Sequence, residues 1–420
     1  MAKKLKQAVL LIHGIGEQRP MDTLRGFVDA VWTSDKDVQH DFAIAGVFSK
    51  PDKISGSFEL RRLTTTKNKN NVRTDFYEFY WAHLMEGTSI GHVVSWAKSL
   101  LLRWPWKVPR QLRGAWWLLV IIILVVLALA VMTALPEGYR VFEIPKWLTG
   151  GLGIASAWLV VPIIKNIIGD AARYLHPAPA NISNRQNIRA KGVEILMKLH
   201  EANEYDRIII VGHSLGSVIG FDILTYAWSL YNDKGDKTKP HPVLDSIESA
   251  VKDQTLKISD YQKLQRELNR ELAENGNPWL VTDFLTLGSP LTHAEILLAK
   301  DKDQLISKQS DREFPTSPPV LESGRFSYPP DGKQRVLHHA AVFGPTRWTN
   351  LYFPARWLIF GDLIGGPLKD LFGWGIADRP VQTKLRKGIF SHTLYWKQGK
   401  AAKAENHIHT LRESLNLLDN

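Results

Sequence analysis

The chain has 420 residues, of which 44% are hydrophobic and 23% charged, and it contains no cysteine. This ordinary composition excludes a globally disordered chain, and the length accommodates one α/β domain with insertions or about two or three average domains. The lack of cysteine excludes a disulfide framework, a thiolate metal site and a cysteine nucleophile. A formal net charge of +11 suits nucleic acid or anionic lipid as a partner, so the distribution of that charge must decide between them.

The first predicted strand is the apolar run Ala8–Ile12, which is followed directly by HGIG at 13–16. The run is too short for the apolar region of a signal peptide, so we expect the N-terminus to remain in the cytoplasm. A His-Gly start after a strand is typical of a loop whose backbone N–H groups face an oxyanion, here those of Ile15 or Gly16. The alternative is that these glycines only form a turn.

A membrane hairpin is predicted after the second predicted strand, Thr74–Trp81. The uncharged run Gly114–Pro136 follows a basic, tryptophan-rich segment at 91–113, which we expect to lie at the membrane interface. A second apolar run, Trp147–Ile164, contains glycine and proline, which lipid-embedded helices tolerate. We therefore assign the hairpin to 114–168.

Positive charge lies on the two outer flanks of this hairpin. Both flanks are therefore expected on the cytoplasmic side, as in a two-helix protein of a bacterial inner membrane. The alternatives are a buried core helix for the first apolar run and a soluble amphipathic helix for 91–106.

The segment RIIIVGHSLGSVIGFD at 207–222 contains a G-x-S-x-G motif centred on Ser214. Such a motif alone arises by chance in about one chain in ten of this size. Here it follows a predicted strand, Arg207–Val211, and precedes a helix-compatible stretch. That context is typical of a sharp strand-to-helix turn that exposes a nucleophilic serine oxygen, rather than of a structural serine.

A turn of this kind has requirements of its own. Its glycines permit the strained backbone, and the backbone N–H after the serine faces the reacting carbonyl group. We therefore expect Gly212, His213 and Gly216 to form the turn around the serine, and Leu215 to supply an oxyanion donor.

A serine nucleophile needs a histidine as base. His392, in SHTLYW at 391–396, is the strongest candidate because it lies late in the chain, after both the serine and any candidate acid. Four competing histidines are expected to lie on the surface: His338, His339, His407 and His409.

The acid that orients this base is expected in a loop after a late strand. Asp362 fits because glycines on either side of it permit a tight loop. Asp370 and Asp378 are the alternative acids, and a helix cap is the alternative role for Asp362.

The remaining pattern predicts an α/β fold. Two more strands, Asp283–Leu287 and Thr349–Phe353, and helical segments such as 184–203 indicate a mostly parallel sheet with helices on both faces. Two excursions interrupt the pattern. Residues 229–279 contain a predicted helix with a capping box from Ser259 to Gln262 and a stop at Gly276, whereas 301–335 is predicted to be a loop or lid. Either excursion could cover the site.

In chain order, HGIG, GHSLGSVIGFDIL, FLTLGSP and SH-x-x-YW resemble the motifs of α/β-hydrolase lipases. They are most similar to those of intracellular phospholipases A1 of the DDHD type and of related bacterial serine esterases. The resemblance covers most of the chain outside 82–180 and the two excursions. It implies a reduced α/β-hydrolase fold formed by 1–90 and 169–420, with Ser214 as nucleophile, His392 as base and Asp362 as acid.

The chain also departs from that family. Seven residues precede the first strand, so the antiparallel strands that open larger hydrolases are expected to be missing. The segment between Tyr352 and Asp362 is a few residues longer than the family pattern. The four-residue DDHD signature has no counterpart that we can place, and the membrane hairpin is not part of the family's usual pattern.

The resulting prediction is a membrane-anchored serine hydrolase that cleaves carboxylic esters. Its expected substrates are lipid or acyl esters, its partners are membrane lipids, and it requires neither a metal nor an organic cofactor. An acyltransferase or thioesterase with the same triad, or an inert hydrolase-fold membrane interaction protein, is the alternative. Nucleic-acid binding is disfavoured because the positive charge gathers at the membrane flanks.

Overall fold

The computed structural model describes residues 6–14, 19–40, 46–84, 179–253, 256–329, 334–355, 360–384, 391–399 and 405–419, with isolated positions from 105 to 174. The chain divides into two compact units, one formed by residues 1–84 with 185–420 and the other by 85–184. Apart from those isolated positions, the predicted interfacial segment and hairpin lie outside the described residues. None of the helices within the described ranges is long and apolar enough to cross a membrane.

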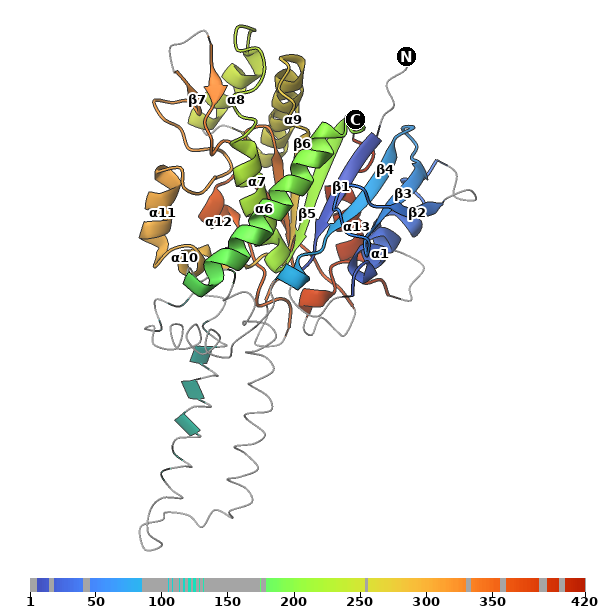
Figure 1. Cartoon of the computed structure of the whole chain (residues 1–420). Coiled ribbons are helices and arrows are strands. Elements are labelled where there is room, and N and C mark those ends of the chain that lie inside the picture. Colours follow the sequence, from blue (N-terminus) through green and yellow to red (C-terminus); the bar gives the residue numbers. More distant parts are fainter. Residues whose placement is uncertain are drawn as a thin grey trace, which may run out of the picture. The chain divides into compact units, whose positions relative to one another are not determined.

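The described elements alternate between strands and helices along the chain (Figure 1). They are β1 (Lys6–Ile12), α1 (Asp22–Val28), η1 (Asp29–Thr33), β2 (Val47–Pro51), β3 (Arg61–Lys67), β4 (Arg73–Phe79), η3 (Ala82–Leu84), α6 (Pro179–Glu201), β5 (Arg207–His213), α7 (Leu215–Trp228), α8 (Pro242–Asp253), α9 (Ile258–Glu274), β6 (Val281–Leu287), η7 (Pro290–His293), α10 (Ala294–Leu297), α11 (Lys302–Ser310), β7 (Ser327–Tyr328), β8 (Val336–Leu337), β9 (Arg347–Tyr352), α12 (Lys369–Phe372), β10 (Ile376–Pro380), η9 (Ser391–Thr393) and α13 (Asn406–Leu415).

The main sheet is mostly parallel, in the order β10-β9-β6-β5-β1-β4-β3-β2. The strands from β10 to β4 are all parallel to their neighbours, whereas β3 and β2 are antiparallel and form one edge. β1 lies between β4 and β5, so the chain leaves β1 toward one side of the sheet and later returns to build the other. A ligand site is expected outside the carboxyl ends of the strands at such a reversal.

Helices cover both faces of the sheet. On one face, Val9, Ile209 and Leu285 belong to a buried cluster that includes Phe27 of α1 and Leu411 of α13. On the other face α7 packs so closely that a Cβ on its Gly220 would lie 2.9 Å from the Phe284 ring and 3.4 Å from Ile12. Figure 1 shows α6 and α7 in front of the strands on this second face. The α/β class predicted from the apolar runs is therefore confirmed.

All five strands predicted from apolar runs are present, as β1, β4, β5, β6 and β9. Sequence patterns missed β2, β3 and β10. β2 and β10 are edge strands with little burial, and β3 reads RRLTTTK, so none of the three presents an apolar run. The two antiparallel strands, β3 and β2, follow the first strand along the chain and form one edge of the sheet; within the described residues no strand precedes β1.

Two local predictions also need correction. The helix predicted from Ser259 begins one residue earlier, at Ile258, with Lys257 at its N-cap and no side-chain cap, so the predicted capping box is absent. The predicted stop at Gly276 is confirmed, because α9 ends at Glu274, Asn275 is its C-cap and Gly276 follows with a left-handed φ of 84°. Residues 301–335 are not a loop throughout, because they contain α11 and β7.

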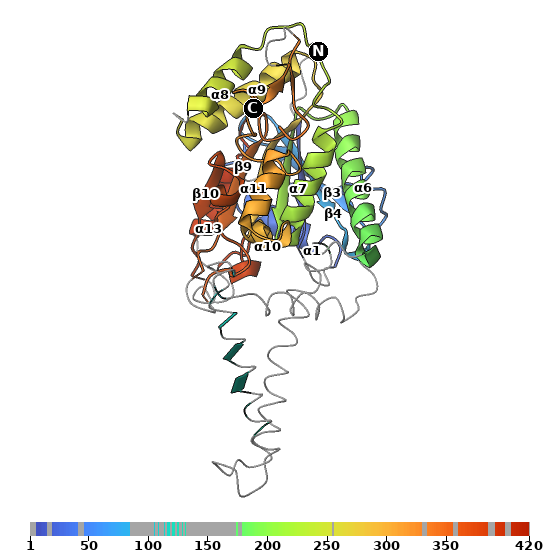
Figure 2. The same ribbon diagram turned by 90° about the vertical axis from the view of Figure 1, so that its left-hand side faces the viewer.

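The excursion 229–279 packs far from the carboxyl ends of the strands. In α9, Gln265 donates to the Thr346 carbonyl oxygen at 3.0 Å and Asn269 to that of Val281 at 3.4 Å, which are positions where β9 and β6 begin. Figures 1 and 2 both show α8 and α9 at one end of the strands and α10 at the other. This excursion therefore does not cover the end of the sheet where Ser214 lies.

A buried ionic network lies at the opening ends of β5, β6 and β9. Asp283 accepts from Arg207 at 2.6 Å and from Arg347 at 2.7 Å, and Arg347 also pairs with Asp419 at 2.5 Å. The network connects three neighbouring strands to the C-terminal segment. It lies at the opposite end of the sheet from the site described next.

Candidate functional site

The candidate site forms where the chain leaves β1 and β5 at their carboxyl ends. His13 and Gly14 follow β1, and Ser214 follows β5. A Cβ placed on Gly14 would lie 2.8 Å from the Ser214 Cβ, so the two turns are in close contact. The site therefore occupies the position that the strand reversal predicts.

Ser214 lies on a strained turn between β5 and α7. Its φ of 52° and ψ of −129° are unusual for a residue with a side chain. A Cβ on Gly216 would overlap the carbonyl oxygen of Ile12, and one on Gly212 would lie 2.5 Å from the Ser217 Cα. The two glycines of the motif are thus required by close backbone approach rather than by a left-handed φ of their own.

His392 and Asp362 lie beside this serine in a continuous hydrogen-bonded chain. The Ser214 hydroxyl is 2.8 Å from His392 Nε2, and His392 Nδ1 is 2.9 Å from Asp362 Oδ2. Because the carboxylate accepts the Nδ1 proton, Nε2 presents a lone pair to the serine hydroxyl. The structure therefore brings together the three residues that the sequence selected.

The carboxylate of Asp362 is buried, and both of its oxygens accept hydrogen bonds. Its Oδ1 accepts the Ile364 N–H at 2.8 Å, and its Oδ2 accepts the Tyr395 hydroxyl at 2.8 Å besides the His392 ring. Burial alone would raise the pKa of this group, but the charge of His392 and the hydrogen bonds, including one from Gly365 N–H, lower the pKa to about 2. Asp362 is thus ionised at neutral pH.

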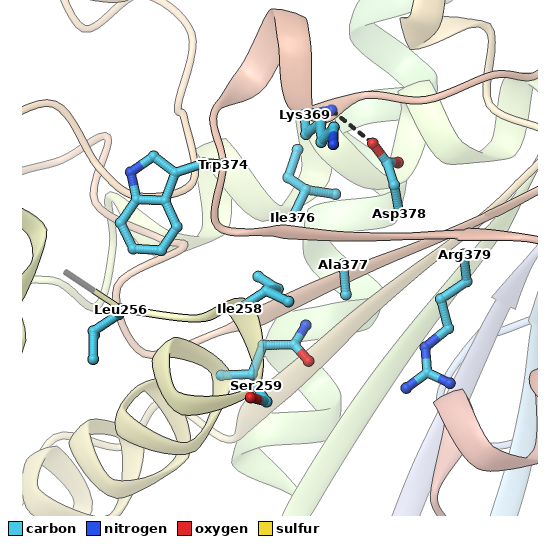
Figure 3. A pocket seen from close by; sticks show the side chains of 10 residues that line it. Leu256, Ile258, Ser259, Lys369, Trp374, Ile376, Ala377, Asp378 and Arg379 are labelled. Atoms are coloured by element: carbon cyan, nitrogen blue, oxygen red, sulfur yellow. Dashed lines mark hydrogen bonds between the residues drawn. The ribbon is translucent and has the colours of Figure 1, made fainter. Parts of the chain in front are cut away.

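Neither alternative acid reaches the histidine. Asp378 lies in a hollow of about 610 Å³ between α9 and β10, where it accepts the Leu368 and Lys369 N–H groups, each at 3.0 Å (Figure 3). Its other partner is the Asn350 side chain, at 2.7 Å. Asp370 is an exposed residue of α12. The lining of this hollow contains none of the three site residues.

The competing histidines have other partners. His338 Nε2 donates to the Val320 carbonyl oxygen at 3.2 Å, and His407 Nε2 donates to that of Lys397 at 2.9 Å. Both rings are buried, so the expectation of a surface location was wrong for these two residues. His339 and His409 are exposed as predicted.

Of the predicted oxyanion donors, Leu215 lies within the described residues. Leu215 is the first residue of α7, where backbone N–H groups lack an acceptor within the helix and the helix dipole favours negative charge. Ile15 and Gly16, the predicted second donors, lie outside the described residues. The turn before them is held in place, because Trp81 Nε1 donates to the His13 carbonyl oxygen at 2.9 Å and its ring stacks on the His13 imidazole.

His213 has a role that the motif did not reveal. Its Nε2 donates to the main-chain carbonyl oxygen of His392 at 2.9 Å, and its ring packs edge-on against Trp396. Burial, followed by the nearby charge of His392, lowers the pKa of His213 to about 3, so the ring is a neutral donor at physiological pH. The turn that carries Ser214 is thereby tied to the main chain of the candidate base.

Sequence reasoning also missed Tyr395. The only available signal was its place in SHTLYW, three positions after the histidine.

Comparisons of the chain with models of protein families, with curated proteins and with solved structures found no match. Among the described residues, no group of three or more potential metal-ligating side chains gathers in one place.

Proposed function

We propose that this protein is a serine hydrolase that cleaves carboxylic esters, built on a reduced α/β-hydrolase fold. The observation that carries the proposal is the chain of hydrogen bonds from Ser214 through His392 to Asp362. Its support is geometric: a hydroxyl on a strained strand-to-helix turn, a base within hydrogen-bonding distance and a buried carboxylate behind that base are what a nucleophilic serine requires.

In the acylation step, Ser214 Oγ attacks the ester carbonyl carbon while His392 Nε2 takes the hydroxyl proton. The negative charge that develops on the carbonyl oxygen is stabilised by the Leu215 N–H and by a donor from the HGIG loop. Asp362 stabilises the imidazolium ion through Nδ1. His392 then gives its proton to the leaving alcohol, and the acyl group remains bonded to Oγ.

In the deacylation step, water attacks the acyl-enzyme. His392 takes a proton from that water, the tetrahedral intermediate collapses, and the same proton returns to Ser214 Oγ as the carboxylic acid leaves. Each step moves one proton between Oγ, Nε2 and the substrate. The proposal therefore needs no redox partner.

Lipid or acyl esters are the proposed substrates because the chain is proposed to be membrane-anchored. Five apolar side chains of the 114–136 run are about half exposed or more: Trp117, Ile121, Leu124, Val125 and Val131. The described positions of this run are helical, and an exposed set of large apolar residues is typical of a membrane or protein contact. Anchoring in a cytoplasmic leaflet would supply lipid substrate at high local concentration.

Purified full-length protein in detergent tests this proposal with p-nitrophenyl esters and with phospholipid in mixed micelles. Ser214→Ala and His392→Ala are expected to abolish hydrolysis, and Asp362→Asn to lower kcat roughly 10⁴-fold. Ser310→Ala, at an exposed serine of α11, is the matched control and should hydrolyse like wild type. Hydrolysis that persists in Ser214→Ala would overturn the assignment.

A further inference from the structure

Asp362 Oδ2 accepts hydrogen bonds from two side chains on one short segment. His392 approaches it with Nδ1 at 2.9 Å, and Tyr395, three positions later, approaches it with its hydroxyl at 2.8 Å. We propose that Tyr395 is a positioning residue for the reaction: its hydroxyl holds Asp362 Oδ2 where that oxygen accepts the His392 proton. The inference rests on the proposed function.

The Tyr395 hydroxyl links two parts of the site. Besides donating to Asp362, it accepts the Phe353 N–H at 3.3 Å, and Phe353 directly follows β9. The Asp362 N–H in turn donates to the Phe353 carbonyl oxygen at 3.2 Å. One phenol therefore fixes the histidine-bearing segment both to the end of β9 and to the loop that carries the acid.

The backbone packs closely around the carboxylate and the phenol, and it also supplies the Ile364 and Gly365 N–H groups to Asp362. A Cβ on Gly288 would lie 2.7 Å from Asp362 Oδ2 and 3.0 Å from the Tyr395 hydroxyl, and one on Gly365 would lie 2.8 Å from the same carboxylate oxygen. These two glycines let the backbone close tightly around the pair. Tyr395 is 1% exposed, so bulk water does not replace its hydroxyl.

No other ionised group shares this carboxylate with His392 in the described surroundings. The titratable groups that face the pair are His213 at the end of β5, His293 of η7 and Tyr395 itself. Burial lowers the pKa of His213 to about 3 and that of His293 to about 4, and burial together with the Asp362 charge raises the pKa of Tyr395 well above its usual value. All three groups are neutral at physiological pH, and Tyr395 remains a donor.

Tyr395→Phe removes this one hydroxyl and keeps the ring. Asp362 Oδ2 then loses a donor, so the carboxylate is less well oriented. Its negative charge is also no longer partly neutralised by the phenol hydroxyl, so the carboxylate attracts the imidazolium ion more strongly. The expected result is a fall of about tenfold in kcat with KM nearly unchanged, because the phenol does not contact substrate. The dependence of kcat/KM on pH should change as well.

Tyr261→Phe is the matched control. Tyr261 is equally buried and donates to the Phe343 carbonyl oxygen at 3.1 Å, but it belongs to α9, which packs where β6 and β9 begin. Its loss should lower stability without changing kcat or the pH profile. Equal effects of the two substitutions on kcat and on the pH profile would reduce Tyr395 to a packing role and overturn the proposal.

A second readout separates this inference from the proposed function. The proton on His392 Nδ1 should give a low-field NMR resonance, assigned by its loss in His392→Ala, that moves in Tyr395→Phe and stays in place in Tyr261→Phe. A resonance that is unchanged in Tyr395→Phe overturns the positioning role even if wild type is active. If the resonance moves in Tyr395→Phe but wild type hydrolyses no ester, the hydrolase proposal is refuted and the geometric link is kept.

Discussion

The Ser214 hydroxyl lies 2.8 Å from His392 Nε2, although the two residues are 178 positions apart in the chain. One comes from the turn after β5 and the other from a short segment after β10, the last strand. A second contact, from His213 Nε2 to the His392 carbonyl oxygen, joins the same two segments at 2.9 Å. The main chain of the candidate base is therefore held by the residue next to the candidate nucleophile.

In this arrangement the Nε2–H group of His213 is the donor that positions the main chain of His392. His213→Gln places an amide N–H near the position of Nε2 and is expected to keep most of the activity, whereas His213→Asn places its amide near the position of Nδ1 and should lower kcat about tenfold. Ester hydrolysis by both variants, with thermal unfolding as a check on folding, measures the difference. Equal activity of the two variants would contradict a role for the Nε2 contact.

Gly14 is predicted to tolerate no side chain. A Cβ there would lie 2.8 Å from the Ser214 Cβ and 3.1 Å from His213 Nδ1, so Gly14→Ala should displace one of the two turns and lower kcat by roughly 10- to 100-fold. Gly26→Ala is the control, because the nearest atom to its Cβ is at 3.5 Å and the position lies in α1. Steady-state kinetics of the pair test this, and a fully active Gly14→Ala enzyme would show that the turns are not in contact.

The buried network at the other end of the sheet predicts how stability depends on pH. Burial would raise the pKa of Asp283, but Arg347 and Arg207 hold it well below its usual range. Because the folded-state pKa is lower than the unfolded one, this stabilisation is complete above about pH 4 and is lost as the pH falls toward the folded-state value.

Asp283→Asn is therefore expected to destabilise the protein by about 3 kcal/mol at pH 7, since it leaves two buried guanidinium groups with less compensation. The difference from wild type should shrink as the pH falls below 4. Urea unfolding at pH 7 and at pH 3.5 measures both effects. A difference that is the same at the two pH values would contradict the assigned cause.

The proposed membrane hairpin predicts a difference in labelling between two introduced cysteines. The chain has no cysteine of its own, so Tyr139→Cys, between the two apolar runs, and Lys263→Cys, on α9, each introduce a single thiol. The Lys263 side chain is 78% exposed. In intact cells an impermeant thiol reagent should label the first variant only, and after lysis both. Equal labelling in intact cells would refute the proposed topology.

The sequence predicted those parts of the fold whose residues carry a strong local signal. Five strands were recognisable because each is rich in apolar and aromatic residues, and Ser214 and His392 were recognisable because their neighbours form ordered motifs. The polar edge strands β2 and β10 present no such run, since an edge strand needs no apolar face. β3 is also missed, because its sequence RRLTTTK contains a single apolar residue.

The roles of His213 and Tyr395 could not be predicted for a different reason. Each acts through a contact between segments that lie far apart in the chain: 179 positions for His213 with His392, and 33 for Tyr395 with Asp362. Local spacing does not encode such contacts. The sequence favoured Asp362 over Asp378, but only the structure shows why Asp378 does not reach His392: it lies within β10 and accepts hydrogen bonds from the Asn350 side chain and from backbone N–H groups.

The most direct test of the central claim is covalent labelling with a fluorophosphonate, a reagent that reacts with activated serine hydroxyls. Detergent-solubilised wild type should gain one phosphonyl adduct, which peptide mass spectrometry places on Ser214, and His392→Ala should gain none. Absence of an adduct in wild type, or an adduct on another serine that persists in Ser214→Ala, would show that this hydroxyl is not activated by the imidazole beside it.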